Sequence, residues 1–249
     1  MAKIFYVNGC SHTAGAEMEY VKSKGTEYDK QHSYAKHIHD NLFSDYEYIN
    51  HAYSGNSNES MALDTINSLS QMLEHTPASD MFVMLGLTDP NRYHFDVPPN
   101  WQIYRNRIRF FTGLDINPDY RYNCATDFPY AKELWTGINA MASNFEQEYR
   151  VFAKDYSLLV NFLESNNLQY RMIQTLHCYD PKFVPEQYNK IYEHYFNNSH
   201  VVNKKGWNNT MFEWLKDKGY SNSIDGRTGH YREDAHIAWA DYLLSRITL

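Results

Sequence analysis

The stretch that decides the fold is Lys3-Ile-Phe-Tyr-Val-Asn8, followed at once by Gly9-Cys-Ser-His-Thr-Ala-Gly15. Its first half is a short β-rich run, and its second half consists of turn-forming and small residues. Ser11 therefore comes just after a predicted strand and at the start of a predicted helix, where its backbone N–H points into the cleft beyond the strand. Such an N–H can stabilise an oxyanion. Taken alone, the segment fits a turn with a helix-capping serine equally well.

Strands and helices alternate along the rest of the chain. Further strands are predicted over residues 46–50, 81–86 and 169–176, and the second of these is a continuous apolar run, which is typical of a buried parallel strand. Amphipathic or helical patterns cover residues 33–43, 59–74, 130–166, 210–218 and 233–247. This order predicts a three-layer α/β/α, flavodoxin-like fold with a mostly parallel central sheet.

A single domain is expected over residues 1–249, because the chain has no visible repeat or linker and its length suits one α/β unit. Prolines at 90, 98 and 99 break the regular pattern after the third strand. We expect irregular, aromatic-rich insertions near 93–130 and 178–207.

Composition and charge argue against several classes of protein. The formal net charge is −7 and no run is rich in lysine and arginine, so we predict no nucleic-acid partner. The longest apolar run, residues 81–87, is too short to span a bilayer, so we predict no membrane partner. The N-terminus does not read as a signal peptide, and a cytoplasmic location is expected.

Cysteine and histidine spacing gives no sign of a disulfide framework or a metal centre. Cys10, Cys124 and Cys178 are odd in number and widely separated, which fits a reducing compartment. His37 and His39 stand two residues apart, a spacing that does not place them on one helix face. We predict no metal and no cofactor.

Polar loops follow the predicted strands, and in parallel α/β sheets ligands bind beyond the carboxyl ends of the strands. Besides the turn that carries Ser11, residues 54–58 and 86–92 are such loops. Near the C-terminus, a glycine-containing loop delivers His230 immediately before the last predicted helix. A neutral histidine can act as the base for a serine, with a carboxylate fixing its tautomer.

In order and spacing, these four segments resemble the sequence blocks of the SGNH (GDSL-like) hydrolase family. Residues 9–11 and Gly15 match the first block, GDSxxxG, with a cysteine where the family has aspartate. Gly55 matches the oxyanion-hole glycine of the second block. Residues 86–89 match the third block, GxND, except that Thr88 replaces the asparagine. The blocks look especially like those of divergent SGNH-like proteins from bacteriophage genomes.

The last block of the family places an aspartate three residues before the catalytic histidine. His230 matches that histidine, but Arg227 stands at the aspartate position and Asp225 is the nearest carboxylate upstream. The candidate residues fall into three roles: catalytic Ser11, His230 and Asp225; oxyanion-hole Ser11, Gly55 and Thr88; and substrate-binding Asn56, Asn58 and Arg92.

The resemblance implies a serine esterase that acts on a small acyl ester, such as an O-acetyl group of a carbohydrate. Aromatic residues of the two insertions could stack on sugar rings or form a satellite core beneath long loops. Because Thr88 and the missing aspartate weaken the machinery, a second hypothesis is an SGNH-fold binding or virion-associated structural protein, in the host cytoplasm or the virion. A third pairs Glu233 with His236 on the last helix and leaves His230 as a loop residue.

Overall fold

A sheet of four parallel strands forms the centre of the molecule. The computed structural model describes residues 2–18, 25–89, 92–96, 107–111, 145–176, 181–203, 210–220 and 230–247, with the backbone alone for 93–96, 107–111 and 145. In spatial order the strands are β2 (Tyr46–Asn50), β1 (Lys3–Gly9), β3 (Met81–Leu87) and β6 (Gln169–Gln174). Each lies where the sequence predicts a strand, which confirms the parallel sheet.

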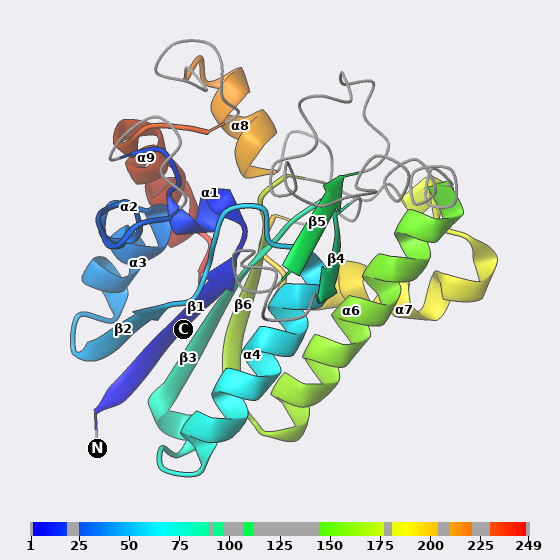
Figure 1. Ribbon diagram of the computed structural model, residues 1–249, viewed down its shortest axis with the longest axis horizontal. Helices are drawn as coiled ribbons and strands as arrows, with labels where there is room; N and C mark the ends of the chain where they lie inside the picture. The colour runs from blue at the N-terminus through cyan, green and yellow to red at the C-terminus, as the bar shows by residue number, and fades with distance from the viewer. Residues whose placement is uncertain are drawn as a thin grey trace.

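Helices cover both faces of this sheet (Figure 1). One face is covered by α4 (Asn58–Leu73) and α6 (Phe145–Ser165), and the other by α3 (Tyr34–Leu42) and α9 (Glu233–Leu244). Because successive strand residues point to opposite faces, Tyr6 packs into the first core and its neighbour Phe5 into the second. The predicted three-layer α/β/α architecture is confirmed.

The strand order places a topological switch point between β1 and β3. Numbered by their place in the chain, the sheet strands run 2-1-3-4, which is the order of flavodoxin-like doubly wound folds. The chain leaves β1 through α3 on one face and, after β2, comes back through α4 on the other face to β3 (Figure 1). Ligands of such sheets bind at the carboxyl ends of the two central strands. Here those ends are Gly9 and Leu87.

The predicted helices near 33–43, 59–74, 210–218 and 233–247 are confirmed, the third of them as α8 (Met211–Asp217). Of the helical segment expected over 130–166, the part from residue 145 is confirmed by α6, and residues 130–144 lie outside the described residues. Two regions differ from expectation. Inside the first expected insertion, β4 (Arg92–Asp96) and β5 (Arg107–Phe111) form an antiparallel pair. The second expected insertion contains α7 (Asn189–Asn197), which packs on α6.

The aromatic residues of α7 belong to the core. Tyr192 and Tyr195 are buried among side chains of α6 and the sheet, so the hypothesis that they stack on sugar rings is wrong. Their spacing of three residues already fits one face of a helix. Trp101 and Tyr104, in the other insertion, lie outside the described residues. Within the described ranges, no helix is long and apolar enough to cross a membrane.

Candidate active site

Ser11 stands at the carboxyl end of β1 on a closely packed turn. The short helix α1 (Ser11–Ala14) begins there, and its Thr13 side chain rests on the two facing strand-end glycines. A Cβ on Gly86 would lie 1.9 Å from Thr13 Oγ1, and one on Gly9 would lie 2.4 Å from the same atom. Glycine at both positions therefore lets α1 approach the sheet and fixes Ser11 beside the switch point.

Ser11 keeps two groups for chemistry. Its side chain is buried, with the residue 3% exposed, and its hydroxyl makes no hydrogen bond to any described residue. Its backbone N–H belongs to the first turn of α1, where amides have no acceptor within the helix; the first bond of the turn runs from Ala14 N–H to the Cys10 carbonyl, 2.9 Å. Ser11 thus brings a hydroxyl and a backbone N–H donor to the same place.

His230 lies directly before α9 and meets the turn that follows Ser11. Its Nδ1 is 3.0 Å from Glu17 Oε2, and the centroid of its ring is 5.2 Å from that of His12, the residue next to Ser11. Its Nε2 makes no hydrogen bond to any described residue, and no hydrogen bond joins it to Ser11. Asp225, the predicted orienting carboxylate, lies outside the described residues and stays a prediction.

His12 is a site residue that the sequence analysis missed. It is 4% exposed, and its Nδ1 is buried without a hydrogen-bond partner among the described residues. Burial, followed by the positive charges of His230, Arg92 and His236, holds the pKa of His12 well below its usual value. The ring is therefore neutral at physiological pH. Its position next to the candidate nucleophile was the available signal.

Asn58 holds Thr88 by both of its amide functions. Asn58 Nδ2 donates to the Thr88 carbonyl at 2.9 Å, and the Thr88 N–H donates to Asn58 Oδ1 at 2.8 Å. The Thr88 hydroxyl is buried and has no hydrogen-bond partner among the described residues. Asn58 thus fixes the loop after β3 and leaves the Thr88 hydroxyl as the group available to a ligand. Direct contact of Asn58 with substrate stays a prediction.

Asn56 links the loop after β2 to the end of β1. Its Nδ2 donates to the Gly9 carbonyl at 3.1 Å, while its Oδ1 is buried without a hydrogen-bond partner among the described residues. Arg92 Nη1 donates to the Asn56 carbonyl at 3.2 Å, which brings the start of β4 to the same loop. Gly55, which directly precedes Asn56 in the loop after β2, has φ +77°, a left-handed conformation that favours glycine.

His236 does not pair with Glu233. His236 is buried and its Nδ1 accepts a hydrogen bond from the Tyr34 N–H at 3.1 Å, whereas Glu233 is exposed at the start of α9. Burial, with a contribution from the positive charge of His230, lowers the pKa of His236 to about 3. The third hypothesis is therefore wrong, because the His236 ring is buried against Tyr34 while the Glu233 side chain is exposed to solvent.

The described residues contain no group of three or more histidine, cysteine, aspartate or glutamate side chains that could hold a metal ion. His39 contacts the Tyr46 carbonyl through Nε2 at 2.8 Å, and its Nδ1 lies 2.9 Å from Asp40. Both of its ring nitrogens thus have protein partners.

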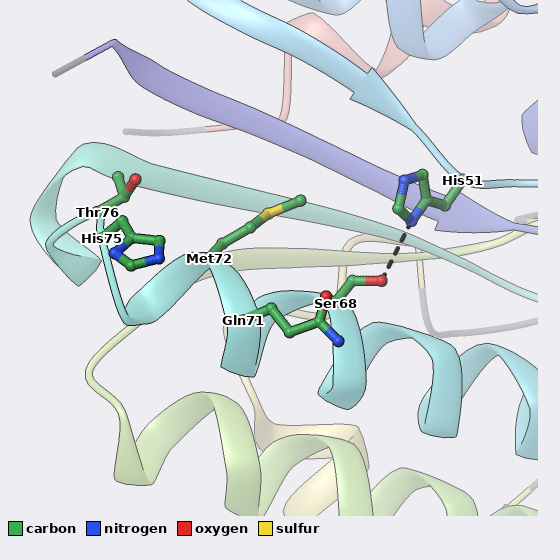
Figure 2. A pocket seen from close by; sticks show the side chains of 6 residues that line it. All are labelled: His51, Ser68, Gln71, Met72, His75 and Thr76. Atoms are coloured by element: carbon green, nitrogen blue, oxygen red, sulfur yellow. Dashed lines mark hydrogen bonds between the residues drawn. The ribbon is translucent and has the colours of Figure 1, made fainter.

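A separate hollow of about 340 Å³ lies along α4 and is shown in Figure 2. Side chains from the end of β2, from α4 and from the turn after α4 line it: His51, Ser68, Gln71, Met72, His75 and Thr76. Ser68 Oγ lies 3.2 Å from His51 Nδ1. No lining residue belongs to the loops that carry Ser11, Thr88 or His230.

The chain matches no known family model. A search of curated protein sequences also gives no match. Similar solved structures include the psychrotrophic esterase EstA from Pseudoalteromonas sp., with 13% identity, 98% of this chain and 96% of that chain covered, and a TM-score of 0.48. The acetyl xylan esterase AlAXEase is 14% identical, with 98% of this chain and 100% of that chain covered and a TM-score of 0.47. A lipolytic G-D-S-L family protein from Veillonella parvula DSM 2008 is 12% identical, with 98% of this chain and 98% of that chain covered and a TM-score of 0.44.

Proposed function

We propose that this chain is a serine esterase of the SGNH type that hydrolyses a small acyl ester. The observation that carries the proposal is the meeting of two distant segments at the switch point: the turn that holds Ser11 and the loop that holds His230. The Ser11 hydroxyl and the His230 Nε2 both lack hydrogen-bond partners among the described residues. These are the two atoms between which a proton must pass when a serine attacks an ester.

In the proposed reaction, Ser11 Oγ attacks the ester carbonyl carbon and its proton goes to His230 Nε2. The tetrahedral intermediate then collapses, the bond to the leaving alkoxide breaks, and the imidazolium returns the proton to that oxygen. Water, deprotonated by His230, hydrolyses the acyl-serine by the same route in reverse. His12, whose low pKa keeps it neutral, does not compete with His230 for the proton.

The oxyanion of the intermediate is proposed to accept hydrogen bonds from the Ser11 and Gly55 amides and from the Thr88 hydroxyl. The unpartnered state of the Thr88 hydroxyl supports its share in this role, since a buried hydroxyl without a partner is costly unless a ligand supplies one. One side-chain donor in such a hole is worth roughly 3 kcal/mol of transition-state stabilisation.

The proposed substrate is an O-acyl, such as O-acetyl, group of a carbohydrate. Arg92 and Asn56 meet beside the end of β1 and would bind polar groups of the alcohol part. This proposal includes the resemblance to the SGNH family and to its phage-encoded members. It also includes the cytoplasmic or virion location that the resemblance implies. It assigns no cofactor and no metal.

The test is labelling of the purified protein with a fluorophosphonate probe, together with hydrolysis of p-nitrophenyl acetate near neutral pH. Both need only nucleophile, base and part of the oxyanion hole, so the natural substrate need not be known. We expect Ser11→Ala to abolish labelling and His230→Ala to reduce it severely, because the two residues act as a unit. Labelling that survives Ser11→Ala would assign the nucleophile to another residue.

A second candidate function is a binding protein that keeps the fold without turnover. It is favoured by the absence of a hydrogen bond between Ser11 and His230. Catalytic hydrogen bonds are often long in unliganded enzymes, so the esterase proposal accommodates the same geometry. A folded wild-type sample that neither labels nor hydrolyses p-nitrophenyl acetate would decide for the binding protein.

A further inference from the structure

Glu17 makes a contact with His230 that no sequence block predicts. Its Oε2 lies 3.0 Å from His230 Nδ1, and the two side chains are 13% and 22% exposed. An ionised carboxylate only accepts hydrogen bonds, so the imidazole nitrogen must donate. We propose that Glu17 is the positioning residue for His230 and takes the part expected of Asp225; this inference rests on the proposed esterase function.

The backbone explains how a residue so close to Ser11 reaches His230. α1 ends after a single turn in a Schellman arrangement, with Gly15 at φ +67° and the Ala16 N–H donating to the Ser11 carbonyl at 2.9 Å. The chain therefore turns back at once. Glu17 itself has φ +71°, a conformation that is unfavourable for a residue with a Cβ. A strained backbone at a non-glycine residue is the kind of feature that functional sites retain.

Asp29 holds the chain in place immediately after Glu17. This buried carboxylate accepts the Met18 N–H at 3.0 Å through Oδ1. Through Oδ2 it accepts the N–H groups of Gly25 at 3.0 Å and Thr26 at 2.9 Å. The residue directly after Glu17 is thus tied to the start of α2 (Glu27–Gln31), which supports the conformation of Glu17 through contacts outside the site.

The contact sets the tautomer that the reaction needs. With Nδ1–H donated to Glu17, the lone pair of His230 lies on Nε2, which can accept the Ser11 proton. The negative charge of Glu17 then stabilises the imidazolium. His12 and His236, whose charges couple to that of His230, are both buried with lowered pKa values, and Arg92 lies in the same cluster. Among the described residues, Glu17 is the carboxylate that contacts the His230 ring.

Glu17→Gln is the direct test, because glutamine keeps the length of the side chain and removes its charge. We expect kcat for p-nitrophenyl acetate to fall by about 10²–10⁴, as expected for loss of the tautomer-fixing carboxylate, with KM within about twofold. The acidic limb of the pH profile of kcat/KM should move to lower pH, because the imidazolium loses its counter-charge. Glu17→Asp should retain more activity than Glu17→Gln.

Two matched variants separate positioning from a general charge effect. Glu233→Gln removes an exposed carboxylate at the first residue of α9, three residues after His230, and should leave kcat unchanged. Asp225→Asn tests the carboxylate that the sequence predicts. A large loss in Asp225→Asn with none in Glu17→Gln would overturn the inference and restore Asp225.

A measurement that does not need turnover keeps this inference distinct from the esterase proposal. In neutral wild-type protein, ¹⁵N NMR of the His230 ring should show the proton on Nδ1, and Glu17→Gln should shift the ring toward a mixture of tautomers. An inert wild-type enzyme with this signature would end the esterase proposal while supporting the Glu17 contact. A proton on Nε2 in the wild-type protein would overturn the inference, even if Glu17→Gln failed to fold.

Discussion

Two serine–histidine pairs can be compared among the described residues, and the pair that is hydrogen-bonded is the poorer candidate for catalysis. Ser68 and His51, in the hollow beside α4, lie within hydrogen-bond distance at 3.2 Å (Figure 2). Ser11 and His230 make no such bond. Ser68, however, stands in the interior of α4, where backbone N–H groups are used by the helix itself.

Ser11 differs in where it stands in the fold. Its own N–H is in the first turn of a helix, the Thr88 hydroxyl at the end of the neighbouring strand has no hydrogen-bond partner among the described residues, and His230 has Glu17 on its other nitrogen. The comparison teaches that the end of a strand at a switch point supplies donors for developing charge, which a helix interior cannot do. A serine–histidine contact is by itself weak evidence for a nucleophile.

The largest expected effect tests this contrast directly. Ser68→Ala and His51→Ala should leave fluorophosphonate labelling and p-nitrophenyl acetate hydrolysis within about twofold of wild type. Ser11→Ala should lower turnover by roughly 10³-fold or more, because the nucleophile is removed outright. Thermal unfolding of all variants controls for folding. Loss of labelling in Ser68→Ala with retention in Ser11→Ala would reverse the assignment of the two pairs.

The sequence predicts the frame of the site better than its contacts. Strand ends, helix starts and the glycines at positions 9 and 86 follow from local patterns, because hydrophobic periodicity and turn chemistry are local. Glu17 and His12 were not predicted. The role of Glu17 depends on a left-handed backbone turn, and that of His12 depends on burial beside His230, from the far end of the chain. Local sequence patterns predict neither property. For the aromatic residues of α7 the sequence left both sugar stacking and a satellite core open, because their burial depends on α6.

The second expected effect concerns stability in the helical layer that holds Ser68. Asp155, on α6, is 1% exposed, and its carboxylate oxygens accept no hydrogen bond among the described residues; Lys154 Nζ lies 3.5 Å from Oδ1. Burial, with the negative charge of Glu59 adding to it and Lys154 opposing it, raises the pKa of Asp155 to about 7. The folded state therefore holds a proton that the unfolded state releases near pH 4.

The contribution of Asp155 to stability should consequently be largest in acid and fall as the pH rises from about 4 to about 7, since a carboxyl with a raised folded-state pKa disfavours ionisation in the folded protein. The lowered pKa values of the buried His12 and His236 act in the opposite direction, so this contribution is read from the difference between wild type and Asp155→Asn. Asp155→Asn should abolish this decline and raise the free energy of unfolding at pH 8 by roughly 2 kcal/mol, with little change at pH 4. Urea unfolding at the two pH values measures it. Esterase activity at a temperature where both proteins are folded should not change, because Asp155 affects stability and not turnover. Parallel curves of unfolding free energy against pH for the two proteins would contradict the prediction.

The smallest expected effect sharpens the difference in oxyanion donors between the two pairs. Thr88→Val keeps the shape of the side chain and removes the hydroxyl. We expect kcat for p-nitrophenyl acetate to fall about tenfold with KM unchanged, which is less than the roughly 10²–10³ typical of an amide donor because the hydroxyl stands on a shorter arm. Thr88→Asn places a longer amide donor at the same position and should raise kcat by about tenfold if the short hydroxyl limits the reaction. Both variants preserve the backbone of residue 88, which Asn58 holds through its N–H and carbonyl, so the loop itself should not move.

Opposite changes in the two variants would show that this side chain stabilises the transition state. Equal rates in wild type and Thr88→Val would remove Thr88 from the oxyanion hole and leave the amides of Ser11 and Gly55 as its donors.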